Sequence, residues 1–115
     1  MIFIIDDDEI MASCIKRAIK GEAKIFGNAI DAMVEISDGR IPDLIFLDVL
    51  LDGPDGFTFL NETASYSDTA KIPVVIVTSL DLPRNDYSAY GVVGVLKKEE
   101  MTPEDIRKYV NEYCK

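Results

Sequence analysis

Histidine and tryptophan are absent from this chain of 115 residues, and cysteine is scarce, with only Cys14 and Cys114. Without histidine, the chain has no imidazole for acid–base catalysis and no histidine ligand for zinc. Two thiols without metal-ligand spacing do not indicate a disulfide framework in a chain of ordinary domain size. The composition therefore argues against a catalytic histidine, a histidine-based zinc site and a disulfide scaffold.

Positive charge is also scarce: 12 Lys and Arg residues face 21 Asp and Glu residues, for a formal net charge of −9. This excess repels nucleic-acid backbones and anionic membranes, so direct nucleic-acid binding is not expected. Every apolar run has only the length of a strand, so membrane insertion is not expected either. The chain opens on MIFII, without the basic start and long apolar core of a signal peptide. We therefore expect a cytoplasmic protein.

Five apolar, β-rich segments alternate with segments of helical periodicity. The predicted strands are residues 2–5, 23–26, 44–47, 74–77 and about 93–97. The predicted helices run from Asp8 to Gly21, from Asn28 to Gly39, from about Phe57 toward Tyr66, and onward from Thr102. A short helix is also predicted within 81–90, where the helical pattern is weak. This alternation predicts a doubly wound α/β fold, in which a five-stranded parallel sheet carries helices on both faces. The length fits a single domain over residues 1–115.

Two of the predicted helices are recognised by their apolar spacing. In the first, Ile10, Cys14 and Ala18 form one row, and Met11, Ile15 and Ile19 form another. In the second, Ile30, Met33, Val34 and Ile36 lie on one side. Both patterns have the period of an α-helix.

Four of the predicted strands stop at residues capable of phosphoryl chemistry. These residues are Asp6-Asp7-Asp8 after the first strand, Asp48 after the third, Thr78 after the fourth and Lys97-Lys98 after the fifth. In an open α/β sheet, ligands bind outside the carboxyl ends of the parallel strands. We therefore expect one acidic pocket with a hydroxyl and an ammonium group beside it.

The acidic residues after the first strand require a counter-charge. Two carboxylates about 4 Å apart repel by roughly 4 kcal/mol at an effective dielectric constant near 20. A hard divalent ion such as Mg²⁺ binds carboxylate oxygens and keeps positions open for phosphate, so we predict that Asp6 and Asp7, together with Asp48, bind a metal. Asp8 alone is better explained as the N-cap of the helix that follows.

Asp48 stands where a carboxylate can attack phosphorus while a metal neutralises the approaching oxygens. Thr78 and one lysine of the Lys97-Lys98 pair are placed to bind phosphoryl oxygens, as phosphoryl transfer requires. Taken singly, each of these residues has an ordinary structural explanation. An aspartate at a strand end, such as Asp48, commonly belongs to a turn. Likewise, a threonine suits a strand and lysines suit a solvated edge. The combination favours the functional interpretation.

Four segments together resemble the receiver domain of two-component response regulators, in order and in approximate spacing. They are IFIIDDDEI, DLIFLDVLLDGPDGF, IPVVIVTS and GVVGVLKK, and the resemblance covers essentially the whole chain. It implies the flavodoxin-like receiver topology and a stand-alone, single-domain response regulator.

The resemblance also assigns roles to individual residues. It implies a Mg²⁺ site at Asp6, Asp7, Asp48 and the backbone carbonyl of Leu50. It implies that Asp48 is the phosphoacceptor, that Thr78 is the switch hydroxyl, and that Lys98 rather than Lys97 is the lysine of the family. Gly56 keeps the glycine of the loop after the phosphoacceptor.

Receivers of this family take a phosphoryl group from a phosphohistidine of a sensor histidine kinase or a histidine phosphotransfer protein. They catalyse only their own phosphorylation and dephosphorylation, and so are not enzymes acting on a separate substrate. Output to a downstream protein is expected through the face formed by the fourth helix, the fifth strand and the fifth helix of the family fold. The sequence departs from the family pattern at Asp52 and Glu99, which replace prolines, and at Val95, which replaces an aromatic residue.

Two alternatives stay open at this stage. A receiver-like domain can serve as a docking module without being phosphorylated, although here all five family positions are chemically competent. A minimal phosphatase resembling the haloacid-dehalogenase superfamily would instead use Asp6 as nucleophile and Asp8 as acid, with Thr78 and Lys98 following in order. That alternative leaves little room for a cap domain and leaves the loop at Asp48 unexplained.

Overall fold

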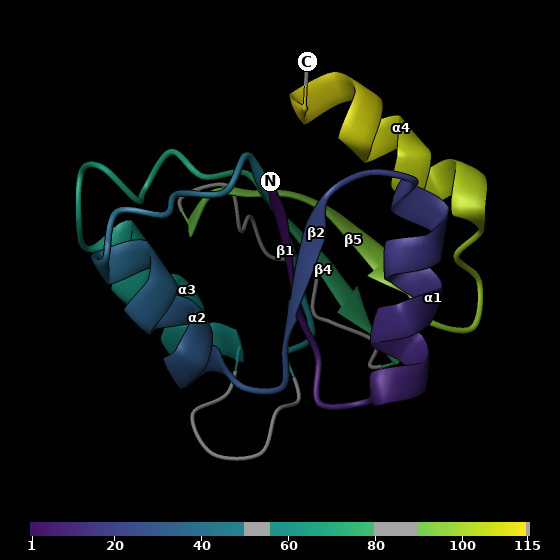
Figure 1. Ribbon diagram of the computed structural model, residues 1–115, viewed down its shortest axis with the longest axis horizontal. Helices are drawn as coiled ribbons and strands as arrows, with labels where there is room; N and C mark the ends of the chain where they lie inside the picture. Colours follow the sequence, from purple (N-terminus) through teal and green to yellow (C-terminus); the bar gives the residue numbers. More distant parts are fainter. Residues whose placement is uncertain (50–55, 80–89, 115) are drawn as a thin grey trace.

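Five parallel strands form one sheet in the order β2-β1-β3-β4-β5 (Figure 1). The computed structural model describes residues 1–49, 56–79 and 90–114. The strands are β1 (Ile2–Ile5), β2 (Ala23–Phe26), β3 (Leu44–Leu47), β4 (Val74–Thr78) and β5 (Val92–Lys97). The predicted five-stranded parallel sheet is confirmed, and β4 and β5 are each one residue longer than expected.

The register of the sheet brings the predicted site residues to one edge. Ile5, the last residue of β1, pairs with Leu47, the last residue of β3. Thr78 at the end of β4 pairs with Lys97 at the end of β5. The residues that follow these strands therefore emerge side by side at the carboxyl edge of the sheet.

Helices cover both faces of the sheet (Figure 1). They are α1 (Glu9–Ile19), α2 (Ala29–Ser37), α3 (Gly56–Ala64) and α4 (Pro103–Tyr113). One core lies between the sheet and helices α2 and α3, and the other lies between the sheet and helices α1 and α4. Within β1, Phe3 belongs to the first core and Ile4 to the second, which explains why this strand is apolar throughout.

Local hydrogen bonds fix where the helices begin. The carboxylate of Asp8 accepts from the backbone N–H groups of Ile10 and Met11 at 3.0 and 3.2 Å. The prediction that Asp8 caps α1 is therefore confirmed. Thr102 and Asp105 form a capping box at the start of α4, so this helix begins where its sequence predicts.

The structure differs from the sequence prediction in small ways. Helix α1 ends at Ile19, two residues before Gly21, because Lys20 adopts a left-handed conformation with φ of 56°. Helix α3 begins at Gly56 and ends at Ala64, earlier than Tyr66. The weak helix predicted within 81–90 falls almost wholly outside the described residues. Within the described ranges, no helix is both long enough and apolar enough to cross a membrane.

Helix α2 packs on the sheet mainly through two alanines and one isoleucine. Its buried residues are Ala29, Ala32 and Ile36. Ile30 and Val34 are instead 55% and 54% exposed. The apolar side chains that revealed this helix in the sequence are thus only partly used by the core.

Candidate functional site

Two buried aspartates stand at adjacent strand ends. The N–H of Asp6 donates to the carbonyl of Phe26 at 3.0 Å, and the N–H of Asp48 donates to the carbonyl of Ile5 at 2.9 Å. Both side chains are nearly inaccessible to solvent. The parallel register therefore continues just past the strands and holds the two carboxylates at the carboxyl edge of the sheet.

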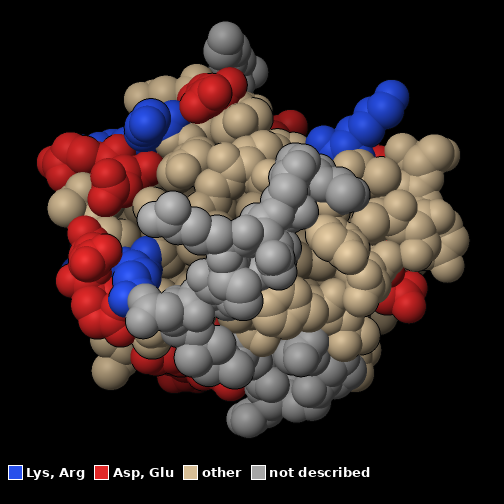
Figure 2. Space-filling view, turned by 180° about the vertical axis from the view of Figure 1, so that it is seen from behind, with Lys and Arg blue, Asp and Glu red and all other residues tan. Residues whose placement is uncertain are grey.

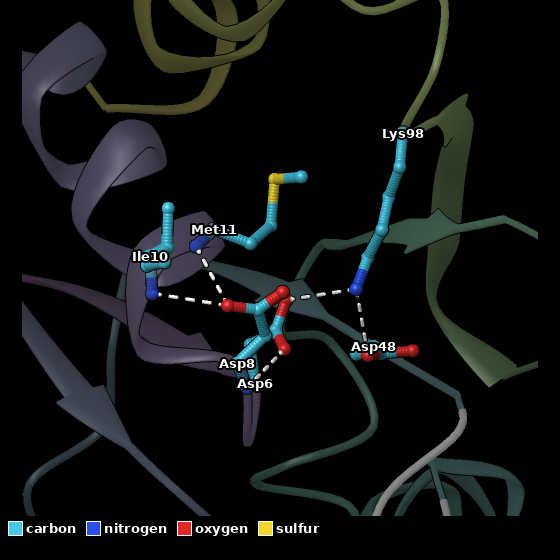
Figure 3. A network of polar contacts seen from close by, with 6 residues as sticks. All are labelled: Asp6, Asp8, Ile10, Met11, Asp48 and Lys98. Atoms are coloured by element: carbon cyan, nitrogen blue, oxygen red, sulfur yellow. Dashed lines mark hydrogen bonds and ion pairs between the residues drawn. The ribbon is translucent and has the colours of Figure 1, made fainter.

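Lys98 supplies the positive charge between these carboxylates (Figure 3). Its ammonium nitrogen Nζ lies 3.0 Å from Oδ2 of Asp48 and 3.3 Å from Oδ2 of Asp6. Lys98 directly follows β5, and its backbone N–H donates to the carbonyl of Thr78 at 2.9 Å. Three strand ends are thus joined in one cluster, in which one ammonium faces two carboxylates.

The Asp6 carboxylate is incompletely satisfied. Its Oδ1 accepts the backbone N–H of Asp8 at 2.9 Å. Its Oδ2 is buried and has the ion pair with Lys98, but no hydrogen bond. Within the described part of the chain it is the one buried side-chain polar atom in this condition. A buried oxygen left without a hydrogen bond costs free energy, so a cation at this position would be stabilising.

A metal ion suits the same place. Carboxylate oxygens of Asp6, Asp7 and Asp48 all lie within 4.8 Å of one another. Asp7 is exposed, whereas the other two are buried, so the cluster is open on one side. Such a set of oxygen donors matches the preference of Mg²⁺, which retains several waters when bound by protein. The predicted fourth ligand, the carbonyl of Leu50, lies outside the described residues.

Burial and charge change the protonation of the cluster. Burial raises the pKa of Asp6 above its ordinary value, and the negative charge of Asp48 raises it further. The hydrogen bond from the Asp8 amide and the positive charge of Lys98 lower this pKa but do not outweigh burial. Burial alone would lower the pKa of Lys98, but the hydrogen bond to Asp48 and the charges of both aspartates outweigh it and raise this pKa. Lys98 therefore remains cationic at neutral pH, while Asp6 holds a proton or another cation more readily than a solvated aspartate does.

Thr78 is the last residue of β4 and is fully buried. Through its carbonyl it is bound to the backbone of Lys98, as described above. Val95, which stands where the family has an aromatic residue, lies on β5 and is 44% exposed. The structure thus places Asp6, Asp7, Asp48 and Lys98 in one cluster and links Thr78 to it through the backbone.

Gly56 is a structural part of the site that sequence reasoning identified only as a loop glycine. Its N–H donates to the carbonyl of Val49 at 3.1 Å. A Cβ atom at this position would lie 2.6 Å from Cα of Val49 and 2.7 Å from the carbonyl oxygen of Asp48. Only glycine therefore allows the start of α3 to pack directly on the backbone that carries Asp48.

Ile10 is a second feature that the sequence did not single out. It lies in the first turn of α1, next to the cap residue Asp8 (Figure 3), and it is 79% exposed. Helical spacing showed that Ile10 belongs to an apolar row but gave no sign that its side chain faces solvent, whereas Ala18 of the same row is buried. An exposed apolar side chain beside an acidic pocket is a candidate contact for a protein partner.

The family model described as the response regulator receiver domain matches residues 2–111. This chain belongs to that family. Over 82 residues the receiver is 32% identical to the response regulator PleD of Caulobacter vibrioides, a match that covers 70% of this chain and 18% of PleD. The chain thus spans about a fifth of the length of that relative.

Solved structures agree with the family. The receiver domain of a signal transduction histidine kinase from Syntrophus aciditrophicus aligns with a TM-score of 0.81 at 25% identity, covering 97% of this chain and 87% of that one. The Mn²⁺-bound form of the response regulator Rcp1 aligns with a TM-score of 0.73 at 25% identity, covering 96% and 88%. The flavodoxin-like topology is confirmed. The family match disfavours the phosphatase alternative, and the acidic pocket disfavours a domain that only docks.

Proposed function

We propose that this receiver accepts a phosphoryl group on Asp48 from a phosphohistidine of a sensor histidine kinase or a histidine phosphotransfer protein. The observation that carries the proposal is the position of the Asp48 carboxylate. It lies 3.0 Å from the Lys98 ammonium and within 4.8 Å of oxygens of Asp6 and Asp7. A nucleophile between a fixed cation and a metal site is the arrangement that phosphoryl transfer uses.

Asp6, Asp7, Asp48 and the carbonyl of Leu50 are proposed to hold Mg²⁺. When bound, the ion would offset the negative charge of the phosphoryl oxygens as they approach the acidic cluster. The incompletely satisfied Oδ2 of Asp6 supports a cation here, as does the Mn²⁺ bound by the related Rcp1.

The proposed reaction is a single displacement at phosphorus. An oxygen of Asp48 attacks the phosphorus atom, and the phosphorus–nitrogen bond of the phosphohistidine breaks. The imidazole leaves with the bonding electron pair and takes a proton from solvent, and the product is an aspartyl phosphate. Lys98 binds a phosphoryl oxygen through its ammonium, and Thr78 donates a hydrogen bond to another. The receiver thereby catalyses only its own phosphorylation and, with water as acceptor, its own dephosphorylation.

Donor recognition is proposed to involve Ile10. This side chain is 79% exposed one turn from the pocket, where a helix of the donor would approach Asp48. Since the donor phosphohistidine proteins of this family act inside the cell, we propose a cytoplasmic location for the receiver.

Phosphorylation is proposed to act by population shift between two conformations. To move the equilibrium from about 1:99 to 99:1, the phosphoryl group has to favour the active conformation by roughly 5.5 kcal/mol. The proposed readout is the face that includes β5 and the final described helix, α4. The fourth family helix, expected within 81–90, and Tyr87 were also predicted to contribute, but residues 80–89 lie outside the described residues. On this face, Val93 and Val95 are exposed apolar residues of β5.

The deciding experiment is intact-mass spectrometry after incubation with a small acyl phosphate and Mg²⁺. One added phosphoryl group is expected on the wild-type protein and none on Asp48→Asn. Asp68→Asn, a substitution at an exposed aspartate on the connection between α3 and β4, serves as the matched control and is expected to be phosphorylated normally. Phosphorylation that survives Asp48→Asn but is lost in Asp6→Asn would point to the phosphatase chemistry instead.

A further inference from the structure

A groove runs between α2 and α3, which lie together on the side of the sheet opposite α1 and α4 (Figure 1). It consists of two hollows of about 390 and 510 Å³. Both hollows are lined by Met33, Ser37 and Glu62, so they are continuous along α2. No residue of the groove belongs to the acidic cluster described above.

The groove has apolar side chains at both ends. Ile30 and Val34 are more than half exposed and lie one helical turn apart on α2. At the far end, Ile41 and Tyr66 are also exposed and line the second hollow. The core does not use Ile30 and Val34, because α2 packs through alanines and Ile36. Exposed apolar side chains gathered along a groove in this way mark an interaction site.

The charged side chains that line the groove are acidic. Among its described lining residues, the charged ones are Asp38, Glu62 and Asp68. Asp38 forms an ion pair with Arg40, in which Oδ2 lies 3.5 Å from Nη1. Glu62 and Asp68 form no ion pair within the described part of the chain. The surface of the molecule is acidic elsewhere too, and Figure 2 shows Asp and Glu side chains gathered along one edge. With a net charge of −9, a second copy of this chain would meet like charge here.

We propose that the groove between α2 and α3 binds a positively charged amphipathic helix of a partner protein. Apolar side chains of that helix would pack between Ile30 and Val34 at one end and Tyr66 at the other, with basic side chains beside Glu62. The nine residues of α2 extend about 13 Å, close to the length covered by helix anchors at positions i, i+4 and i+7. An apolar groove with an acidic rim selects a basic partner by charge complementarity.

This interaction goes beyond the proposed phosphoacceptor function and does not depend on it. The groove is formed in the unmodified protein, so binding is expected without phosphorylation. Asp48→Asn is expected to retain it. Failure of either proposal therefore leaves the other testable.

The test is selection from a displayed library of helical peptides of about 15 residues, the length at which isolated helices become stable. Peptides are selected on the wild-type protein and counter-selected on Val34→Glu, after circular dichroism has shown that this variant is folded. The expected binders carry apolar residues at i, i+4 and i+7 and a net positive charge. Their dissociation constants are then measured on variants by fluorescence anisotropy.

Glu62→Lys is expected to weaken binding of these peptides by about tenfold or more, because it places like charges opposite one another. Glu112→Lys, an equivalent substitution on the exposed side of α4, is the control and is expected to change binding by no more than about twofold. Recovery of no binder that distinguishes Val34→Glu from wild type overturns the proposal. So does recovery of acidic binders, or a dimer of the wild-type protein in sedimentation velocity that Val34→Glu abolishes.

Discussion

The backbone N–H of Lys98 donates to the carbonyl of Thr78 at 2.9 Å, so the lysine of the site is attached to the end of β4 as well as to β5. The same residue extends its ammonium to the two buried aspartates. We therefore expect a displacement of the end of β4 to move Lys98 and to change the charge balance of the pocket. This link joins the proposed switch residue to the proposed phosphoacceptor through the backbone and the side chain of Lys98.

Replacing Lys98 by methionine is expected to destabilise the metal-free protein. The ammonium lies within 3.3 Å of Asp6 and 3.0 Å of Asp48, and its removal leaves two like charges buried together. We expect a loss of about 1–3 kcal/mol in the free energy of unfolding, below the value for a fully buried pair because the pocket is open to water. Mg²⁺ should bind the variant more tightly, since Lys98 no longer competes for the same oxygens. Urea unfolding with and without Mg²⁺ measures both effects.

Lys16→Met, a substitution at an exposed lysine of α1, is the control for this experiment and is expected to leave stability nearly unchanged. Equal unfolding curves for Lys98→Met and the wild type would contradict the assigned role of Lys98 in the pocket.

Asp6→Asn is expected to stabilise the metal-free protein at neutral pH. Burial raises the pKa of Asp6 above its ordinary value of 3.8, so the folded state binds a proton more tightly than the unfolded state does. Asp6 therefore lowers the free energy of unfolding progressively as the pH rises from 3.8 through the raised pKa of the folded state. Above that pKa, the free energy of unfolding stays lower by a constant amount. Asparagine removes the charge and with it this part of the pH dependence. Thermal unfolding in a chelator across this pH range provides the measurement.

Asp7→Asn separates the two roles of an aspartate in this cluster. Asp7 is exposed, so its replacement should weaken Mg²⁺ binding without the stability gain expected for Asp6→Asn. A wild-type pH profile retained in Asp6→Asn would show that another group is responsible for it.

Gly56→Ala is expected to impair phosphorylation by displacing the backbone at Asp48. The added methyl group would contact Cα of Val49 and the carbonyl oxygen of Asp48 at distances that force a shift of main-chain atoms. Because a misplacement near 1 Å can cost about a hundredfold in rate, we expect the initial rate with a small acyl phosphate to fall by at least about tenfold. Gly27→Ala is the matched control, since nothing lies within 4 Å of a Cβ at that position. Equal rates for the two variants would exclude the close approach at Gly56 as a determinant of the site.

Ile10→Glu is expected to slow transfer from a phosphohistidine protein and to leave phosphorylation by a small acyl phosphate unchanged. The side chain is exposed and lies outside the carboxylate cluster, so it can act on docking alone. The ratio of the two rates, measured by intact mass with a cognate donor, is the informative quantity. A parallel decrease in both rates would mean that the substitution damages the pocket itself. Ile25→Glu on β2 controls for a charge at another exposed isoleucine.

The placement of the polar site residues at the ends of particular strands was predictable from the sequence, because each strand end is a local feature. Apolar runs such as residues 44–47 stop abruptly at a polar residue, and a parallel sheet brings those ends to one edge. The cap at Asp8 was predictable for the same reason, since it involves only the next three residues. The family motifs then distinguished Lys98 from Lys97.

Contacts between distant segments were not predictable in this way. Helical spacing identified α1 and α2 but could not show that Ile10, Ile30 and Val34 face solvent, because two apolar rows on one helix are equivalent until the sheet is placed. The approach of Gly56 to the Asp48 carbonyl and the missing hydrogen bond at Oδ2 of Asp6 are likewise consequences of packing. These features depend on how distant segments pack, which local sequence patterns do not specify.

The ion pairs of Lys98 with Asp6 and Asp48 also bear on how the chain is made. A ribosome synthesises both aspartates long before it reaches the lysine, and domains generally fold from the amino-terminal end as they emerge. Until β5 has joined β4, the pairing of β1 with β3 brings two carboxylates together without their ammonium partner. The charge balance of the pocket is therefore completed only when the last strand of the sheet, β5, brings Lys98 into place.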